Sequence, residues 1–322
     1  MRISWIAAFW PAAVCVPLCL GLALWAQNAP APPAAGAVDS NQEEARFSSG
    51  VTQVDVLFTV TDKKGRFVTD LNVNDFEVIE NKRPQFIQQF TAESDLPLRL
   101  ALLVDTSNSI RTQFRFEQQA AIRFMNGVMR PKQDRMLLIG FDTTPELVSD
   151  LTNDMQVLEK GVNGMRPGGG TSLYDAIYFA AKEKLMMDQP REKFRRAMIL
   201  ISDGDDTQSR YTRDQALEMA QKADTVIYAI STNTTRTGDS DGDKVLKFLT
   251  EETGGQAFFP FKVEDLDQSF ENIANELRHQ YNVLYHPDPL KTDGLYHPIT
   301  VRVKTRKELI VKARKGYYAP RL

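Results

Sequence analysis

Cysteine and histidine are scarce in this sequence. The 322 residues include only two cysteines and three histidines, and Cys15 and Cys19 both lie in the apolar N-terminal segment. If that segment is removed, the mature chain has no disulfide, no thiol nucleophile and no cysteine-bound zinc. The three histidines, His279, His286 and His297, have no metal-ligand partner at a suitable spacing. Packing or surface positions are therefore expected for them.

A strong charge of either sign is also missing. The formal net charge is −3 at pH 7, so no basic field suggests a nucleic acid as partner. The hydrophobic content of 42% is ordinary for a globular protein, and the length suits two domains.

The longest run without charge stands at the N-terminus. Residues 3–26 are uncharged and follow Arg2, which is the pattern of a signal peptide or an N-terminal membrane anchor, within residues 1–26. Gly21-Leu22-Ala23 offers small residues for cleavage, and we favour a cleaved signal. In either case Arg2 stays inside and acidic residues follow, so an exported protein, periplasmic or extracellular, is expected.

A segment rich in alanine and proline follows at residues 27–50. It has too little apolar bulk to fold and is expected to be an extended linker. A leftover disordered terminus is the alternative interpretation.

Strand patterns occur at both ends of the remaining chain, in residues 51–95 and 281–322. Alternating segments are found at 54–60, 76–80, 84–90, 281–285, 299–304 and 309–313. Neither end has enough strands to fold alone. We therefore predict a small antiparallel β-sandwich built from both chain ends, with residues 96–280 inserted between its halves. Two separate small sheets are the alternative, and they would leave unpaired edges.

Residues 96–280 alternate between strand and helix patterns, which favours an α/β domain with a parallel sheet. Strands are expected at 98–105, 135–142, 146–149, 196–202, 226–231 and 256–259. Helices are expected at 112–129, around Glu159, and at 171–187, 212–222, 243–252 and 264–281.

Oxygen-bearing side chains follow two of these strands and one glycine-rich turn. Asp105, Ser107 and Ser109 come after the first apolar strand, Thr171 follows three glycines, and Asp203 ends the strand at 196–202. Parallel strands end at the same sheet edge, where open α/β folds bind ligands. These two carboxylates and three hydroxyls predict an oxygen-only site for a hard divalent cation. Helix capping by hydroxyls such as those of Ser109 or Ser172 is the alternative.

The order Asp-x-Ser-x-Ser, Thr, Asp-Gly resembles the metal-ion-dependent adhesion site of the von Willebrand factor type A family, with all five positions filled. The resemblance covers about residues 96–280. It implies a doubly wound, mostly parallel α/β domain, in which the strand at 146–149 is the short antiparallel one. It also implies Mg²⁺ at the site, with Mn²⁺ or Ca²⁺ as other candidates, and a protein partner that supplies an acidic residue to the metal.

These features predict an exported, metal-dependent protein-binding module, of the adhesion or scaffold type, that captures an Asp or Glu of a partner and is not an enzyme. Neutral hydroxyl ligands leave a cation short of negative charge, so it should seek an anionic ligand from outside. One alternative is a metal-dependent hydrolase or phosphotransferase with Asp105 as nucleophile. Such enzymes usually have a second acid two residues on, where this chain has Ser107. Another alternative is a passive scaffold with a structural metal.

Other acidic residues follow the strands of the same domain. The segment 239–243 resembles a calcium loop, but Lys244 stands where that loop requires glycine. We therefore expect a solvated loop with Asp243 as a helix N-cap. Asp205 and Asp206 are expected to be simple surface residues, with tuning of the local charge or orientation of metal-bound waters as the alternative. Asp142 is interpreted as a turn residue or as an outer-shell group of the metal site.

Overall fold

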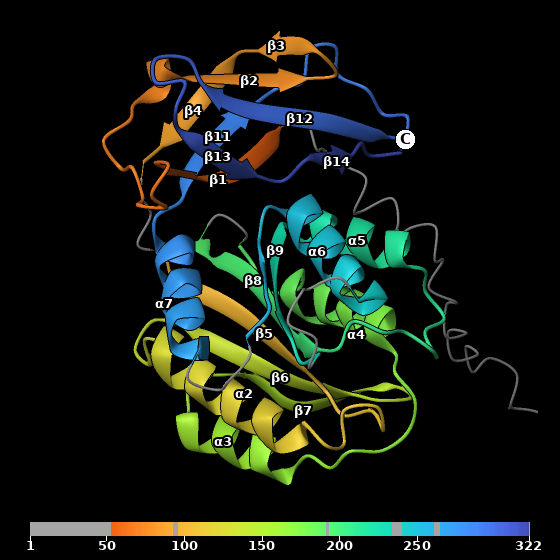
Figure 1. Ribbon diagram of the computed structural model, residues 1–322. Helices are drawn as coiled ribbons and strands as arrows, with labels where there is room; N and C mark the ends of the chain where they lie inside the picture. Colours follow the sequence, from red (N-terminus) through yellow and green to blue (C-terminus); the bar gives the residue numbers. More distant parts are fainter. Residues whose placement is uncertain (1–52, 93–95, 191–192, 234–239, 261–264, 322) are drawn as a thin grey trace, which may run out of the picture. The chain divides into compact units, whose positions relative to one another are not determined.

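One mostly parallel sheet and two antiparallel sheets organise the protein (Figure 1). The computed structural model describes residues 53–92, 96–190, 193–233, 240–260 and 265–321. The expected signal peptide or anchor and the expected linker lie outside these residues. No helix in the described part of the chain has the length and apolar character needed to span a bilayer.

The central sheet has six strands in the order β10-β9-β8-β5-β6-β7. Its strands are β5 (Leu98–Asp105), β6 (Arg135–Phe141), β7 (Pro145–Thr152), β8 (Arg195–Ser202), β9 (Thr225–Ser231) and β10 (Ala257–Phe258). The pairs β5–β6, β5–β8, β8–β9 and β9–β10 are parallel, whereas β6 and β7 are antiparallel. The expected early antiparallel strand is therefore present.

Helices cover both faces of this sheet (Figure 1). One face carries α2 (Phe114–Val128), α3 (Met155–Gly164) and α7 (Asp265–Arg278), and the other carries α4 (Leu173–Phe179), α5 (Arg213–Lys222) and α6 (Asp241–Thr253). Alternate side chains of a strand point to opposite faces. Leu100 and Leu102 accordingly pack in the first core, and Ala101 and Leu103 in the second. Because both faces are buried, the strand is apolar from Leu98 to Val104 with the single exception of Arg99.

Two helix predictions need correction. The helix expected at 171–187 is a short α-helix, α4, followed by a π-helical turn, η2 (Ala180–Leu185). The helix expected from Asp243 begins at Asp241, with Ser240 as its N-cap. The Ser240 hydroxyl accepts a hydrogen bond from the Asp243 amide at 3.0 Å. Asp243 is thus neither the N-cap nor solvated, because its side chain is fully buried.

Strands from both chain ends mix in the two antiparallel sheets, ordered β13-β1-β11-β4 and β14-β12-β2-β3. The N-terminal strands are β1 (Val54–Thr61), β2 (Phe76–Glu80), β3 (Arg83–Gln85) and β4 (Ile87–Thr91), with a 3-10 turn η1 (Val73–Asp75) before β2. The C-terminal strands are β11 (Tyr281–Tyr285), β12 (Tyr296–Val303), β13 (Ile310–Ala313) and β14 (Gly316–Tyr318). Val56 pairs with Val283 in one sheet and Val78 with Val301 in the other. All four side chains belong to one hydrophobic core.

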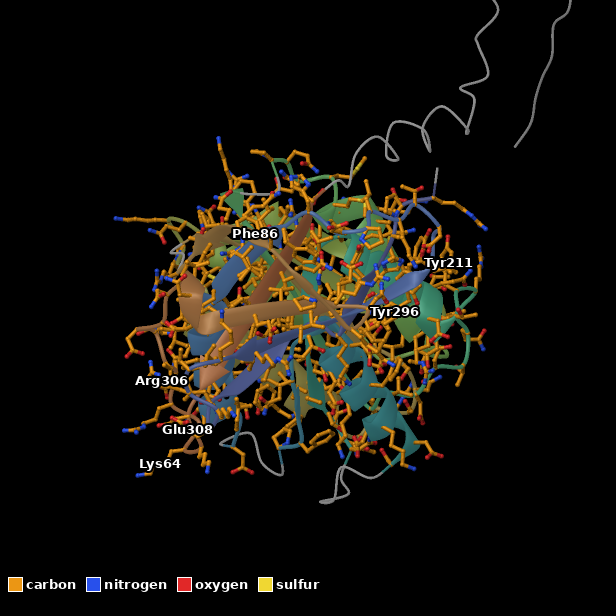
Figure 2. The ribbon with its side chains drawn as sticks, turned by 90° about the horizontal axis from the view of Figure 1, so that it is seen from above. Lys64, Phe86, Tyr211, Tyr296, Arg306 and Glu308 are labelled. Carbon is orange, nitrogen blue, oxygen red and sulfur yellow. The ribbon has the colours of Figure 1, made fainter. Side chains whose placement is uncertain are left out.

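The strand expected at 84–90 is two strands instead of one. β3 pairs with β2, and β4 pairs with β11 in the other sheet. Phe86 lies between them and is 82% exposed (Figure 2). The chain changes sheets at this residue, which an uninterrupted alternating pattern did not indicate.

The antiparallel sheets contact the α/β domain through charged side chains. Lys312 of β13 forms an ion pair with Glu276 of α7 at 2.8 Å, and Lys315 pairs with Glu252 of α6 at 3.2 Å. α7 ends at Arg278, and β11 of the antiparallel sheets begins at Tyr281. The last helix is therefore joined to the antiparallel sheets by a very short connection.

Candidate metal centre

The two predicted aspartates lie at the same edge of the central sheet. Asp105 is the last residue of β5, and Asp203 directly follows β8. These strands are parallel neighbours, with Val104 opposite Ile201. The amide of Thr106 donates to the carbonyl oxygen of Phe141 at 2.8 Å, so β6 fixes the direction in which the chain leaves β5.

A chain of hydrogen bonds joins four of the five predicted residues. Asp105 Oδ1 accepts from the Ser107 amide at 2.8 Å, and its Oδ2 accepts from the Ser202 hydroxyl at 2.7 Å. The hydroxyls of Ser107 and Ser109 are 2.8 Å apart. Ser109 in turn donates to Asp203 Oδ2 at 2.8 Å. The spacing of alternate residues thus brings both carboxylates and both serines together, as expected from the sequence.

The glycine-rich turn is tied to the first loop by its backbone. The Gly168 amide donates to the carbonyl oxygen of Thr106 at 2.7 Å, and the Asn108 amide donates to the carbonyl oxygen of Gly169 at 3.2 Å. Gly169 has a φ of +69°, a left-handed conformation that glycine adopts without strain. These hydrogen bonds therefore hold the glycine-rich turn against the loop at residues 105–109, which we call the aspartate loop.

Thr171, the fifth predicted residue, is held by a third loop. Its amide donates to the Thr207 hydroxyl at 3.0 Å, and its carbonyl oxygen accepts from the amides of Thr207 and Gln208, each at 2.9 Å. Its side chain is almost fully buried. The neighbouring Ser172 occupies an N-cap position but makes no side-chain capping bond, so the capping alternative fails for this residue.

The backbone around Asp203 packs tightly against the start of α6. Gly204 has a φ of +85°, and a Cβ atom there would lie 2.2 Å from the carbonyl oxygen of Gly242. The Asn233 side chain donates to the carbonyl oxygen of Asp203 at 2.8 Å and to Asp243 Oδ1 at 3.0 Å. Close packing and a side-chain amide together fix the position of Asp203.

Negative charge accumulates at this edge. Burial raises the pKa of Asp105 to about 6, with a smaller increase from Asp203, although hydrogen bonds from Ser107 and Ser202 oppose the shift. Burial followed by repulsion from Asp203 also raises the pKa of the exposed Asp205. A shift in this direction means that the surrounding hydrogen bonds do not fully compensate these carboxylates for lost hydration and mutual repulsion.

The residues present fit a hard divalent cation. The donor atoms are carboxylate and hydroxyl oxygens, the ligand type that Mg²⁺ prefers. The described residues include no group of three or more His, Cys, Asp or Glu that could hold a metal by themselves. Any cation at this edge would therefore depend on the hydroxyls of Ser107, Ser109 and Thr171 as well as on Asp105 and Asp203.

Three residues of this edge were not predicted from the sequence as part of the site. Ser202 bonds to Asp105, and Asn233 bonds to the backbone of Asp203. The third is Glu117 of α2, which is fully buried and lies close enough to Asp105 for their charges to interact. Ser202 immediately precedes Asp203, but Asn233 and Glu117 belong to other elements and carry no motif.

The remaining acidic residues at this edge have mixed outcomes. Asp205 is exposed, as expected. Asp206 is more than a simple surface residue, because it accepts from the Tyr174 amide at 3.3 Å and from the Ser209 hydroxyl. Asp142 accepts from the Thr144 amide at 3.4 Å, which fits the interpretation as a turn residue.

A hollow of about 700 Å³ lies beside the candidate centre. Its walls include Thr106 and Asp142 from the site edge, the side chains of Val148 and Val157, and the charged Lys160. Val157 is 47% exposed. The edge of the sheet therefore offers a partly apolar depression next to the cluster of oxygens.

Comparison with known proteins assigns the α/β domain to a family. Residues 100–276 match the family model of the von Willebrand factor type A domain. No curated protein matches the chain. Among solved structures, a von Willebrand factor type A protein from Catenulispora acidiphila is similar at 11% identity, with 78% of this chain and 75% of that chain covered and a TM-score of 0.48.

Two other solved structures are also similar to this chain. Proximal thread matrix protein 1 from the mussel byssus, described with a zinc-occupied MIDAS motif, is 15% identical, with 60% of this chain and 48% of that chain covered and a TM-score of 0.48. An aerotolerance-related membrane protein from Bacteroides fragilis is 16% identical, with 56% of this chain and 98% of that chain covered and a TM-score of 0.45.

Proposed function

The chain belongs to the von Willebrand factor type A domain family, and we propose that it is a metal-dependent protein-binding module. A divalent cation, preferably Mg²⁺, would be held by Asp105, Ser107, Ser109, Thr171 and Asp203. The cation would then bind an Asp or Glu side chain of a partner protein. The observation that carries this proposal is the set of hydrogen bonds that joins Asp105 to the Ser107 amide, the Ser107 hydroxyl to the Ser109 hydroxyl, and Ser109 to Asp203.

An acidic partner suits the donor set. Three of the five proposed ligands are neutral hydroxyls, and Mg²⁺ usually retains exchangeable water positions. A carboxylate from outside can occupy such a position and add charge-assisted contacts. The neighbouring hollow, with Val148 and Val157 in its walls, offers apolar surface for the residues next to that carboxylate.

A binding role is favoured over catalysis by the environment of Asp105. This side chain is 0% exposed, and its two oxygens accept hydrogen bonds from the Ser107 amide and the Ser202 hydroxyl. A nucleophile must be able to reach the reacting atom of a substrate. Asp105 is instead fixed inside the protein by these two hydrogen bonds, which supports a role in holding the cation and not in attacking a substrate.

Export is part of the proposal and rests on the sequence. The uncharged residues 3–26 after Arg2 fit a signal peptide or membrane anchor. We also propose that the mature protein consists of the α/β domain inserted in a β-sandwich formed by both chain ends. The shared core of the antiparallel sheets supports this arrangement.

Calorimetric titration of the full-length chain with Mg²⁺ and with Mn²⁺ tests the metal site. Asp105→Ala should lower cation affinity by at least about tenfold, or about 1.4 kcal/mol, because it removes a buried carboxylate of the centre. The matched control is Asp241→Asn. This acid is the first residue of α6, and its side chain is 95% exposed. Equal affinity in the wild type and Asp105→Ala would contradict the proposed centre.

Selection from a random peptide library tests the partner class. We expect peptides enriched in the presence of Mg²⁺ to contain Asp or Glu, and we expect their binding to disappear when EDTA is added. Replacing the acidic residue of a selected peptide with Asn or Gln should abolish its binding. Enrichment that is equal with Mg²⁺ and with EDTA would refute metal-dependent capture.

A further inference from the structure

Glu117 is a buried acid with no protein partner in the described part of the chain. It lies in the first turn of α2 and is 0% exposed. Neither of its carboxylate oxygens has a hydrogen-bond partner among the described residues, and the nearby hydroxyl of Thr232 also lacks one. Buried polar groups in proteins are nearly always hydrogen-bonded, so this exception needs a physical reason.

The Glu117 carboxyl group lies close enough to Asp105 and Asp203 of the candidate metal centre to interact with their charges. Burial raises the pKa of Glu117 well above its usual value, and repulsion from Asp105 and then Asp203 raises it further. The nearby hydroxyl of Thr232 lowers this pKa because it can donate a hydrogen bond to the carboxylate. The Thr232 amide donates to the carbonyl oxygen of Ser202 at 3.1 Å. Glu117 therefore lies near the ends of β5, β8 and β9, where the oxygen-bearing loops begin.

The rest of the buried face of α2 is mostly apolar. Phe114, Ala121 and Phe124 occupy the same face, and an apolar side chain at position 117 would avoid the cost of burying an unpaired carboxylate. Glu276 of α7 shows the usual solution, because this buried acid pairs with Lys312 at 2.8 Å. For Glu117, no cationic side chain in the described part of the chain plays that role.

We propose that Glu117 is a charge-balancing residue of the metal centre, whose carboxylate stabilises a bound divalent cation from within the protein. This inference rests on the proposed metal-dependent function and adds a residue outside its five ligands. A divalent cation attracts a buried carboxylate strongly because the interior screens charge poorly. Glu117 thereby helps the centre to retain its cation before a partner carboxylate arrives.

The consequence is that Glu117 has opposite effects with and without the metal. Without a cation, the buried acid is repelled by Asp105 and Asp203, and among the described residues only the nearby Thr232 hydroxyl offsets this repulsion. With a cation, it contributes attraction. A residue that served only to support the fold would stabilise both forms and leave cation affinity unchanged.

Titration of the full-length protein with Mn²⁺ alone, combined with thermal unfolding in EDTA, separates these roles. Glu117→Gln keeps the shape and removes the charge. We expect its Mn²⁺ affinity to fall about tenfold, or about 1.4 kcal/mol, while its unfolding temperature in EDTA equals or exceeds that of the wild type. Glu117→Met repeats the test without the amide group.

Glu276→Gln is the matched control, because it neutralises another buried acid, one that has a protein partner. It should leave Mn²⁺ affinity unchanged and lower the unfolding temperature in EDTA. Wild-type affinity in Glu117→Gln would overturn the role of Glu117 while leaving the metal centre intact. Loss of folding in both Glu117 variants would also overturn it, because the acid would then support the fold. Absence of Mn²⁺ binding to the wild-type protein would refute the proposed centre itself.

Discussion

Replacement of Gly204 by alanine should damage both the fold and the metal centre. This glycine follows Asp203 and has a φ of +85°. An added Cβ atom would lie 2.2 Å from the carbonyl oxygen and 2.6 Å from the carbonyl carbon of Gly242. Both obstacles are backbone atoms at the start of α6, so neither can turn aside as a flexible side chain would.

The expected cost has two parts. A left-handed backbone costs a residue with a Cβ atom about 1–2 kcal/mol, and overpacking at a rigid site costs about 1–3 kcal/mol more. Together they predict that Gly204→Ala lowers the free energy of unfolding by roughly 2–5 kcal/mol. To relieve the clash, the backbone at position 204 must shift away from α6. This shift should also move the neighbouring Asp203 and weaken cation binding.

Gly65→Ala isolates the packing part of this cost. Gly65 has a φ of +76°, and no described heavy atom outside its immediate chain neighbours lies within 4 Å of an added Cβ atom. Its alanine variant should therefore show only the backbone cost of about 1–2 kcal/mol. Urea denaturation of both variants gives the comparison. If Gly204→Ala is no more destabilised than Gly65→Ala, the added Cβ atom at position 204 causes no steric clash with α6, and the predicted packing cost is refuted.

Three further substitutions test the surroundings of the site. Gly127→Ala in α2, where no described atom obstructs a Cβ, should stabilise the protein by about 0.5–1 kcal/mol through helix propensity; an unchanged or lower urea midpoint would contradict this. Arg278 donates to the buried Asp134 at 2.8 Å, and Arg278→Met should cost about 3–5 kcal/mol in urea because it leaves that charge unpaired; a cost below 1 kcal/mol would refute the buried pair. Burial and then Asp224 raise the pKa of Asp55 from 3.8 to about 6, so the folded state binds a proton more tightly than the unfolded state. Raising the pH from 4 to 7 should therefore lower wild-type stability by roughly 2–3 kcal/mol relative to Asp55→Asn, and parallel stability curves for the two proteins would show that the shift is absent.

The sequence contained enough information to predict the α/β domain and the convergence of Asp105, Ser107, Ser109 and Asp203 at one sheet edge. The run from Leu98 to Val104 is apolar except for Arg99 because both faces of β5 are covered, and this pattern indicates a buried parallel strand. Alternate spacing in Asp105, Ser107 and Ser109 indicated that the three side chains converge. Hydrogen bonds then join these residues to Asp203.

Features that depend on distant contacts could not be predicted in the same way. Ser240 and Asp243 both suit an N-cap, and the choice depends on the packing that buries Asp243 against Ser231 and Asn233. The division of the expected strand at Phe86 depends on which partner strands lie nearby, since β3 and β4 join different sheets.

The sequence around Glu117 carries a signal of a buried acid. The spacing of Glu117 from Phe114, Ala121 and Phe124 places it on the same side of a helix. The expected helix at 112–129 would therefore have buried an acid, and a buried acid near a predicted metal site is itself informative. Its lack of a partner, however, becomes visible only when the surrounding elements are assembled.

Anomalous diffraction from crystals grown with Mn²⁺ tests the central claim most directly. We predict an anomalous peak between the aspartate loop and the glycine-rich turn, within bonding distance of oxygens from the group Asp105, Ser107, Ser109, Thr171 and Asp203. An ordered site with no peak at saturating Mn²⁺, or a peak held by other residues alone, would contradict the account.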